Sequence, residues 1–343
     1  MFGFSECQRI LKNEPDYRLK QAKKAVFQDL IGDWQKATNL PKALREQLTS
    51  NCSLEIKAKL WKAKDSQSDK SLITLNDGLR VETVLMRHKG GRNTVCVSSQ
   101  VGCPLACKFC ATGKLGFKRN LTFSEIISQV LFFARFLKKQ NQKIVNIVFM
   151  GMGEPFLNID NVFKAIKLLN DKDGFNLGAR HFSISTVGIT EGIKRLANEF
   201  PQVNLALSLH AADNKLRSQL MPINKKYPLS QVVKTIDAYI KKTNRRVMLE
   251  YIMIAGVNDS CQDAKKLAVL AKRLLCFVNL ITYNPTGDFQ PSPTKKINEF
   301  KQILEKHQVP YTQRYRFGQE IKAACGQLAE QGRSRAFLSF RPI

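Results

Sequence analysis

The sequence of 343 residues has no long apolar run; its best candidate, residues 126–137, is interrupted by two polar residues and an arginine. Since a membrane-spanning helix needs about 20 mostly apolar residues, no membrane span is expected. Residues 1–19 also lack the charged start, apolar core and cleavage site of a secretory signal peptide. The 19 glycines and 12 prolines follow no repeat, which excludes a collagen-like or low-complexity chain. We therefore predict a cytoplasmic protein that has no membrane partner.

Acidic residues are scarce: 28 Asp and Glu stand against 55 Lys and Arg, which gives a net charge of +27. Residues 81–343 hold 40 of the basic and 18 of the acidic side chains, a net charge of +22. Solubility of a small domain needs a net charge of only about 2–8, so this excess favours a polyanionic partner. We expect nucleic acid. A membrane surface is the alternative, but no amphipathic basic helix with exposed aromatic residues supports it.

Nine cysteines are an odd number, and the chain is too long for a small secreted scaffold, so a disulfide framework is not expected. Cys7, Cys52, Cys261 and Cys276 lie in amphipathic or apolar surroundings. We predict that these four pack as small hydrophobic residues. The other five cysteines are candidates for chemistry.

The pattern of apolar residues divides the chain into three parts. Residues 1–62 show helical spacing and predict a small helical domain. Residues 63–90 combine a polar stretch, 64–71, with two predicted strands around the turn Asn76-Asp77-Gly78, so we expect a linker and a β-hairpin. In residues 91–343, short apolar runs alternate with segments of 15–35 residues that mostly have helical spacing.

This alternation predicts right-handed βαβ units around a parallel sheet. The runs are too apolar to face water on one side, as expected for buried parallel strands. Six or so units make most of a barrel, so the predicted fold is α/β: a partial parallel (βα) barrel with a small N-terminal helical domain. In such barrels the chemistry lies at the C-terminal ends of the strands. The runs are residues 94–99, 144–150, 181–186, 204–209, 247–254, 278–283 and 311–317.

Cys103, Cys107 and Cys110 follow the first of these runs with the spacing C-x3-C-x2-C. Three thiolates on one tight loop can bind three irons of a [4Fe–4S] cluster and leave the fourth iron open for an exchangeable ligand. A structural zinc ion is the alternative. Zinc needs four ligands, and Cys96 is the only nearby residue that could complete the set. The spacing therefore favours the iron–sulfur cluster.

With Phe109 before its last cysteine, this motif resembles that of the radical S-adenosylmethionine superfamily. The longer stretch 96–122 is similar to the RlmN/Cfr family of RNA methyltransferases within it. Further segments match in the order in which the family has them. They are Val81-Glu82-Thr83, Gly151-Met-Gly-Glu-Pro155, Ser183-Ile-Ser-Thr186, Ser208-Leu-His210, Leu220-Met-Pro-Ile223, Gly256-Val-Asn-Asp259, Tyr283-Asn-Pro285 and Ala323-Ala-Cys-Gly-Gln-Leu328.

The resemblance implies that the three cysteines hold a [4Fe–4S] cluster and that two molecules of S-adenosylmethionine are used per turnover. Glycine allows close approach to the methionine amine, and a carboxylate can pair with its charge. Single serine or asparagine residues after strands are more often structural, but several at separate strand ends favour a binding site. The expected cofactor contacts are Gly153, Glu154, Ser185, Ser208, Leu209, His210 and Asn284.

The resemblance also implies covalent catalysis. Cys325 would accept a methyl group, a radical formed from the second cofactor molecule would remove a hydrogen from it, and the carbon would add to adenine. Adenine C2 and C8 are not nucleophilic, so direct polar methyl transfer is not feasible. Cys96 would release the product by forming a transient disulfide with Cys325, and Glu82 would accept the proton. On residue pattern alone, Cys325 would be a buried structural thiol and Glu82 an ordinary strand-edge glutamate.

The expected reaction is methylation of C2 of an adenosine in 23S ribosomal RNA, before full ribosome assembly. The resemblance adds the transfer RNA adenosine beside the anticodon as a second substrate, and flavodoxin or ferredoxin as electron donor. Residues 1–62 are expected to help bind RNA. Two alternatives stay open: methylation at C8, as in Cfr, and a non-catalytic zinc-bearing RNA-binding protein. Val101 and Gly153-Glu154-Pro155 look more like the C2 enzymes.

Overall fold

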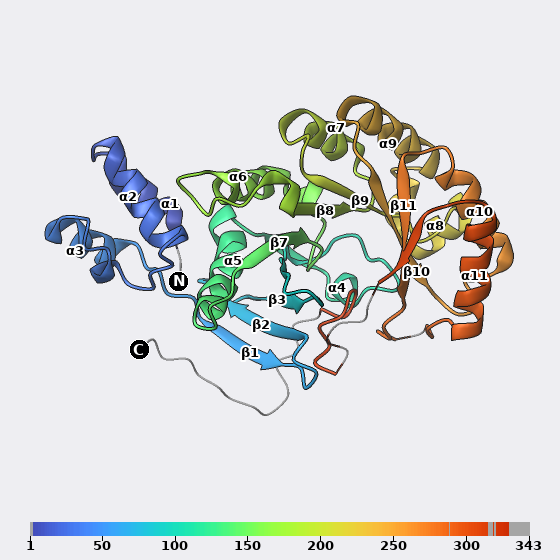
Figure 1. Cartoon of the computed structure of the whole chain (residues 1–343), viewed down its shortest axis with the longest axis horizontal. Coiled ribbons are helices and arrows are strands. Elements are labelled where there is room, and N and C mark those ends of the chain that lie inside the picture. The colour runs from blue at the N-terminus through green and yellow to red at the C-terminus, as the bar shows by residue number, and fades with distance from the viewer. Residues whose placement is uncertain (1–2, 288, 315–317, 319, 329–343) are drawn as a thin grey trace.

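A ten-stranded sheet, with seven parallel strands, organises the protein (Figure 1). The computed structural model describes residues 3–287, 289–314, 318 and 320–328. Each parallel strand overlaps one of the seven predicted runs, although residues 315–317 of the last run lie outside the described residues. The strands in the middle of the sheet are buried along most of their length. They are β4 (Asn93–Cys96), β7 (Ile144–Phe149), β8 (Phe182–Thr186), β9 (Asn204–Ser208), β10 (Val247–Met253), β11 (Cys276–Thr282) and β12 (Tyr311–Gln313).

Three antiparallel strands extend the sheet beyond β4. They are β1 (Ala58–Lys62), β2 (Ser68–Thr74) and β3 (Arg80–Arg87). The order is β1-β2-β3-β4-β7-β8-β9-β10-β11-β12, and among the described residues the edge strands β1 and β12 do not pair. The sheet is therefore open, and the predicted partial parallel barrel is confirmed.

Helices connect the parallel strands and cover the outer face of the curved sheet (Figure 1). Each turns an apolar face to the strands, as the helical spacing predicts. They are α5 (Phe123–Lys138), α6 (Ile159–Asn170), α7 (Thr190–Glu199), α8 (Asn214–Leu220), α9 (Leu229–Thr243), α10 (Cys261–Ala271) and α11 (Thr294–Lys306). In the part of the chain that the structure describes, no helix has the length and apolar character needed to cross a membrane.

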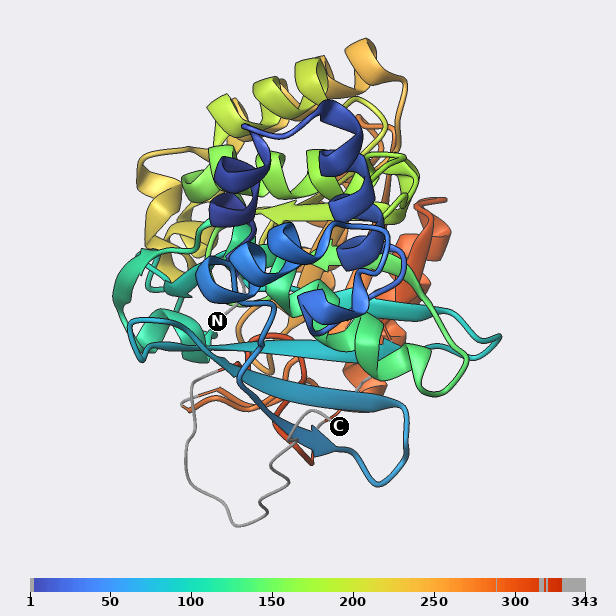
Figure 2. The same ribbon diagram turned by 90° about the vertical axis from the view of Figure 1, so that its left-hand side faces the viewer.

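The N-terminal helices α1 (Phe4–Leu11), α2 (Asp16–Phe27) and α3 (Lys42–Asn51) form a separate layer beside α5 (Figures 1 and 2). Arg135 of α5 joins the two layers, because its guanidinium donates hydrogen bonds to the carbonyls of Leu54 (2.8 Å) and Ile31 (2.6 Å). The Lys23 ammonium also lies 2.7 Å from the carboxylate of Asp171.

Two predictions for the first 90 residues are wrong. Residues 58–62, expected to be helical, form strand β1, because they pair with β2. The polar stretch 64–71 is only partly a loop: β2 begins at Ser68, and its polar side chains are buried. Partners on the neighbouring strand stabilise these buried polar groups. Asp69 accepts a hydrogen bond of 2.7 Å from Arg87, and Lys70 pairs with Glu82.

The prediction for the four outlying cysteines is correct only for Cys276, which is buried. Cys7 and Cys52 are buried as well, but they pair as a disulfide, with their Cα atoms 5.4 Å apart. Cys261 is exposed. The pairing crosses 45 residues of sequence and depends on how α1 packs against the end of α3, which no local pattern encodes.

Helix α5 begins with a capping box that orients it behind the sheet. Thr122 Oγ1 accepts a hydrogen bond from the Glu125 amide, and the Glu125 carboxylate accepts one from the Thr122 amide. We expect Thr122→Ala to lower the free energy of unfolding by about 1 kcal/mol, because an orphan amide of the first turn loses its acceptor. Thr122→Ser keeps the hydroxyl and should stay close to the wild type in urea unfolding. Equal midpoints for the wild type and Thr122→Ala would contradict this role.

Candidate active site

The three cysteines of the C-x3-C-x2-C motif lie on a loop between strands β5 (Gln100–Gly102) and β6 (Phe117–Asn120), which pair antiparallel. The Cys103 amide closes the base of the loop by donating to the Gly116 carbonyl at 2.9 Å. Gly102 has φ +76°, and a Cβ there would lie 1.9 Å from the Gly116 oxygen. Only glycine therefore allows the loop to close in this way.

Two thiols of this loop, those of Cys103 and Cys107, are hard to ionise without a nearby cation. Burial, with a smaller contribution from the nearby Cys110 sulfur, raises the pKa of Cys103 to about 12. Burial also raises the pKa of Cys107 well above its usual value, and the sulfurs of Cys110 and Cys103 add to the effect. Thiolates are the form that binds metal, and a strongly positive centre among these sulfurs would favour their ionisation.

The donor set of three cysteines fits an iron–sulfur cluster. A [4Fe–4S] cluster takes each thiolate on a different iron, so its ligands stand further apart than those around one zinc ion. Three cysteines on one loop therefore fit a cluster with one iron left open.

Gly153 and Glu154 lie directly beyond β7, as predicted. Gly153 has φ +99°, and a Cβ there would come within 2.5 Å of Gln100. The buried Glu154 carboxylate accepts hydrogen bonds from the amides of Val187 (2.9 Å) and Phe156 (3.2 Å). Burial raises its pKa to about 7 despite these bonds. A carboxyl group so close to half ionisation favours a cationic partner such as an ammonium group.

The ends of β8 and β9 bring two predicted hydroxyls together: Ser185 Oγ and Ser208 Oγ lie 3.1 Å apart and share a hydrogen bond. Leu209 differs from its neighbours because its side chain is fully buried. Both of its backbone groups are also occupied, the amide by the Glu250 carbonyl and the carbonyl by Arg217. The contact of Leu209 with the cofactor stays a prediction.

His210 is buried with a left-handed backbone, φ +56°. Its Nδ1 accepts a hydrogen bond of 3.2 Å from the Ile252 amide, and its ring meets the edge of Phe109 at 4.8 Å between centroids. Burial, with a smaller effect of Arg217, lowers its pKa to about 3. The imidazole is therefore neutral and carries its proton on Nε2.

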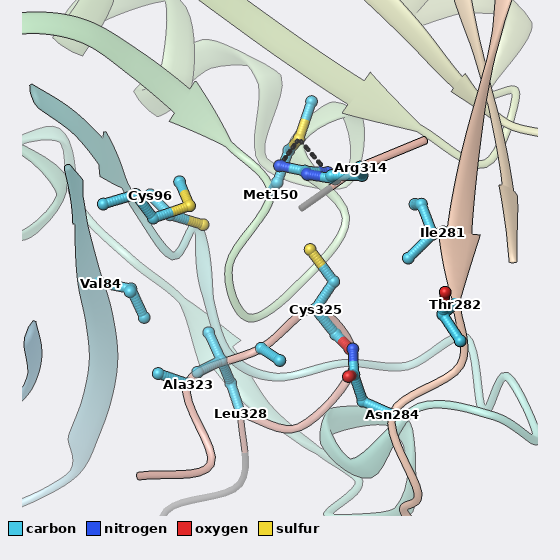
Figure 3. Close-up of a pocket in the computed structure, with 12 residues that line it drawn as sticks. Val84, Cys96, Met150, Ile281, Thr282, Asn284, Arg314, Ala323, Cys325 and Leu328 are labelled. Atoms are coloured by element: carbon cyan, nitrogen blue, oxygen red, sulfur yellow. Dashed lines mark hydrogen bonds between the residues drawn. The ribbon is translucent and has the colours of Figure 1, made fainter. Parts of the chain in front are cut away.

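The two isolated cysteines line one pocket, together with Asn284 and Arg314 (Figure 3). Cys96 ends β4 and is buried, whereas Cys325 comes from the C-terminal segment, and both are free thiols. The Cys325 sulfur points into the pocket. Burial, with a contribution from Cys325, raises the pKa of Cys96 to about 12. The structure thus joins two thiols that are 229 residues apart in the sequence.

Hydrogen bonds to the cluster loop hold the C-terminal segment in place. The Ala111 amide donates to the Gly326 carbonyl at 2.8 Å, and Thr112 Oγ1 donates to the Leu328 carbonyl at 2.6 Å. Asn284 Nδ2 donates to the Cys325 carbonyl at 3.2 Å. These three bonds fasten Cys325 between the cluster loop and the end of β11.

Arg314 was not predicted as a site residue. It follows β12, and its guanidinium lies 3.7 Å from the Glu250 carboxylate and donates to Met150 Sδ at 3.7 Å. The Cys325 sulfur, with Glu250 and Cys96, raises the pKa of Arg314. The pocket thus contains a permanent cation facing both thiols. The rule that places chemistry after strand ends also applies to Arg314 and could have identified it.

Glu82 is fully buried in β3 rather than at a strand edge. Side chains alternate along a strand, so Glu82 shares the face that carries Val84 and Met86, and both of these line the pocket. Lys70 Nζ donates to Glu82 Oε1 at 2.9 Å. Lys70 was missed because its polar neighbours suggested a loop.

His210 makes stability depend on pH. The unfolded chain binds a proton near pH 6.5, but the folded protein does so only near pH 3. The free energy of unfolding should therefore fall by roughly 4 kcal/mol as pH drops across this interval. His210→Gln cannot titrate and should remove this part of the slope in unfolding measurements on the metal-free protein. His181→Gln, at an exposed position, is the control; equal slopes for all three proteins would exclude a buried neutral imidazole.

Comparison with known proteins agrees with this geometry. The model of the Radical SAM superfamily matches residues 97–268, which include the cluster loop. A "Probable dual-specificity RNA methyltransferase RlmN" of Dictyoglomus turgidum is 44% identical over 331 residues, 95% of each chain. The "Ribosomal RNA large subunit methyltransferase Cfr" of Clostridium botulinum is 43% identical over 323 residues, 92% of each chain.

A solved structure shares the whole architecture. The crystal structure of a radical SAM methyltransferase from Sphaerobacter thermophilus matches with a TM-score of 0.90 and 42% sequence identity. The match covers 94% of this chain and 96% of that chain. The chain therefore belongs to the RlmN/Cfr family of radical S-adenosylmethionine RNA methyltransferases, which use a [4Fe–4S] cluster and S-adenosylmethionine.

Proposed function

We propose that the protein methylates C2 of an adenosine in 23S ribosomal RNA. The observation that carries the proposed two-thiol mechanism is the pocket shared by Cys96 and Cys325. A reaction that carries the methyl group on one sulfur and releases the product with a second sulfur needs two thiols in one cavity. Family membership favours this enzyme over the alternative of a non-catalytic zinc-bearing RNA-binding protein.

Cys103, Cys107 and Cys110 are the proposed cluster ligands, and the strand ends around Glu154, with Ser185, Ser208, His210 and Asn284, are the proposed cofactor contacts. When bound, the cluster and S-adenosylmethionine supply an electron, a methyl group and a radical that abstracts hydrogen. The neutral imidazole of His210 offers an Nε2–H donor to a carboxylate or a ribose hydroxyl.

Cys325 Sγ accepts the first methyl group and becomes S-methylcysteine. Its carbon then loses a hydrogen atom and forms a bond to adenine C2, so that the RNA is joined to the protein. Asn284 fixes the backbone at Cys325 through its hydrogen bond to the carbonyl. Small neighbours on either side, Ala324 and Gly326, leave room for the base.

Release requires a proton acceptor and a second thiolate. Glu82 accepts the proton from C2 while the adduct radical gives up one electron, which the cluster would take back when bound, and Lys70 orients the Glu82 carboxylate through the hydrogen bond of 2.9 Å. Cys96 Sγ then attacks Cys325 Sγ and a disulfide forms. The bond between sulfur and the transferred carbon breaks, its electron pair stays on that carbon, and the carbon takes up a proton to become the methyl group. Because burial opposes ionisation of Cys96, the guanidinium of Arg314 supports this step by offsetting the thiolate charge.

The RNA is held mainly by positive charge. We assign residues 1–62 to an accessory unit that helps to bind RNA, residues 63–90 to a linker and hairpin, and residues 91–343 to the catalytic barrel. The net charge of +22 on residues 81–343 supplies most of the contacts to phosphates. Ribosomal RNA before full assembly is the proposed substrate, which places the enzyme in the cytoplasm. A transfer RNA is the second substrate that its dual-specificity relatives suggest.

Cys107→Ala should lose iron and all cleavage of S-adenosylmethionine to 5′-deoxyadenosine, because one cluster ligand is missing. RNA binding should persist, since phosphate contacts come from other residues. Iron analysis and chromatography of the cleavage products measure both effects, with Cys276→Ala as a matched control that removes a buried thiol away from the loop. Cofactor cleavage by Cys107→Ala would show that the ligand assignment is wrong.

The two pocket cysteines should fail at different steps. Cys325→Ala should transfer no methyl group and form no covalent link to RNA. Cys96→Ala should still join RNA to Cys325 but fail to release it, so cross-linked protein should accumulate and appear as a nuclease-sensitive shift on a denaturing gel. Normal turnover by folded Cys96→Ala would refute the two-thiol mechanism. A cross-link in the double variant would refute Cys325 as the carrier.

The position of methylation is decided by analysing the product. Identity to RlmN and Cfr relatives is nearly equal, so the choice of C2 rests on Val101 and on Gly153-Glu154-Pro155. Mass spectrometry of nucleosides from ribosomal RNA treated with the enzyme should find 2-methyladenosine. Detection of 8-methyladenosine instead would assign the Cfr reaction and leave the mechanism intact.

A further inference from the structure

Arg217, on α8, is a fully buried arginine whose three side-chain nitrogens all donate hydrogen bonds. Its Nε donates to the Leu209 carbonyl at 3.1 Å, and one terminal nitrogen donates to Asn224 Oδ1 at 2.5 Å. The other terminal nitrogen donates to the carbonyls of Val187 (2.6 Å) and Ser208 (3.2 Å). The guanidinium therefore connects the ends of β8 and β9, where the proposed cofactor contacts lie.

All of these acceptors are neutral. Within the described residues, no carboxylate lies within ion-pair distance of Arg217. A buried charge without a counter-charge is costly, because hydrogen bonds to neutral groups replace only part of the lost hydration. Burial accordingly lowers the pKa of Arg217 to about 10. A charge that is kept in the core at this cost is stabilised by any negative group that comes close to it.

The cluster loop, once its thiolates are ionised, is one source of negative charge close to α8, beside the buried Glu154 carboxylate, which accepts from the Val187 amide. The Lys108 amide donates to the Leu220 carbonyl at 3.0 Å, so α8 is attached to the loop by its last residue. His210 follows the segment that Arg217 holds, and its ring contacts Phe109 between two of the proposed ligands. The Cys107 sulfur raises the pKa of Arg217, in keeping with these contacts.

We propose that Arg217 is a positioning residue whose buried charge is balanced by the cluster thiolates and raises the reduction potential of the cluster. Reduction adds one electron, taken from an external one-electron donor protein, and so adds one negative charge. A fixed cation stabilises the reduced state more than the oxidised state, because net charge nearby helps to set the potential of such clusters. The inference rests on the proposed ligands Cys103, Cys107 and Cys110, and not on the chemistry of RNA methylation.

Arg135 provides a matched control, because it is also largely buried and bonded only to carbonyls, and burial lowers its pKa to about 10. It lies on α5 at the contact with the N-terminal helices, away from the loop. We suggest measuring midpoint potentials of Arg217→Met, Arg217→Lys and Arg135→Met holoproteins by redox titration with electron paramagnetic resonance. The potential of Arg217→Met should become more negative, while Arg217→Lys and Arg135→Met should remain near the wild type.

An unchanged potential in Arg217→Met would overturn the inference, as would an equal negative shift in Arg217→Lys, because geometry rather than charge would then be responsible. For a variant that binds too little cluster for a redox titration, the iron content is measured instead. Loss of iron by Arg217→Met alone supports the balance of charges. Loss by both Arg217 variants, with Arg135→Met retaining iron, would overturn it and leave a purely structural role. Iron retained by Cys107→Ala would contradict the proposed ligands instead.

A second measurement needs no redox titration. If cluster thiolates balance Arg217, cluster loading should stabilise the wild type more than Arg217→Met, because only the wild type gains the missing counter-charge. Thermal unfolding of apo and holo forms of both proteins gives this difference. Equal gains in the two proteins would contradict the proposed balance, and a smaller gain in Arg217→Met would support it.

Discussion

The attachment of the C-terminal segment to the cluster loop is the interaction on which the rest of the site depends. Two hydrogen bonds, from Ala111 to Gly326 and from Thr112 to Leu328, join segments more than 200 residues apart. They place Cys325 opposite the end of the first parallel strand, where Cys96 stands. Without them the barrel would still present a cysteine loop and strand-end polar groups, but the second thiol would not reach the pocket.

Buried charge is the second constraint on this site, and each buried ionisable group is stabilised by a different set of partners. Glu82 has Lys70, and Glu250 has Arg314 and Asn279. Glu154 has two backbone amides and the Thr186 side chain as hydrogen-bond partners, and burial raises its pKa to about 7. Removing one partner from such pairs is expensive, because the other charge stays in a medium that solvates it poorly. At the surface, water would stabilise such charges. In the interior, each of them depends on partners within the protein.

Much of the fold could be predicted because parallel strands are buried on both faces and therefore have a distinct composition. The same regularity located Glu154, Ser185, Ser208 and Asn284 at strand ends. It failed where polar residues are buried with partners, as at Lys70 in β2, since polar composition alone suggests a loop. Leu209 shows a different limit: its motif position matches the family, but both of its backbone groups are bonded within the protein.

By itself, the sequence determined the cysteine loop, the alternation of strands and helices, and the family. These follow from local spacing and composition, which the chain carries without reference to distant residues. Only the tertiary structure decided that Cys96 and Cys325 share a pocket, that Arg314 faces both, that Cys7 pairs with Cys52, and that Arg217 is buried without a carboxylate partner among the described residues. These contacts join distant segments, and their energies depend on burial and on neighbouring charges, which exist only once the chain is folded.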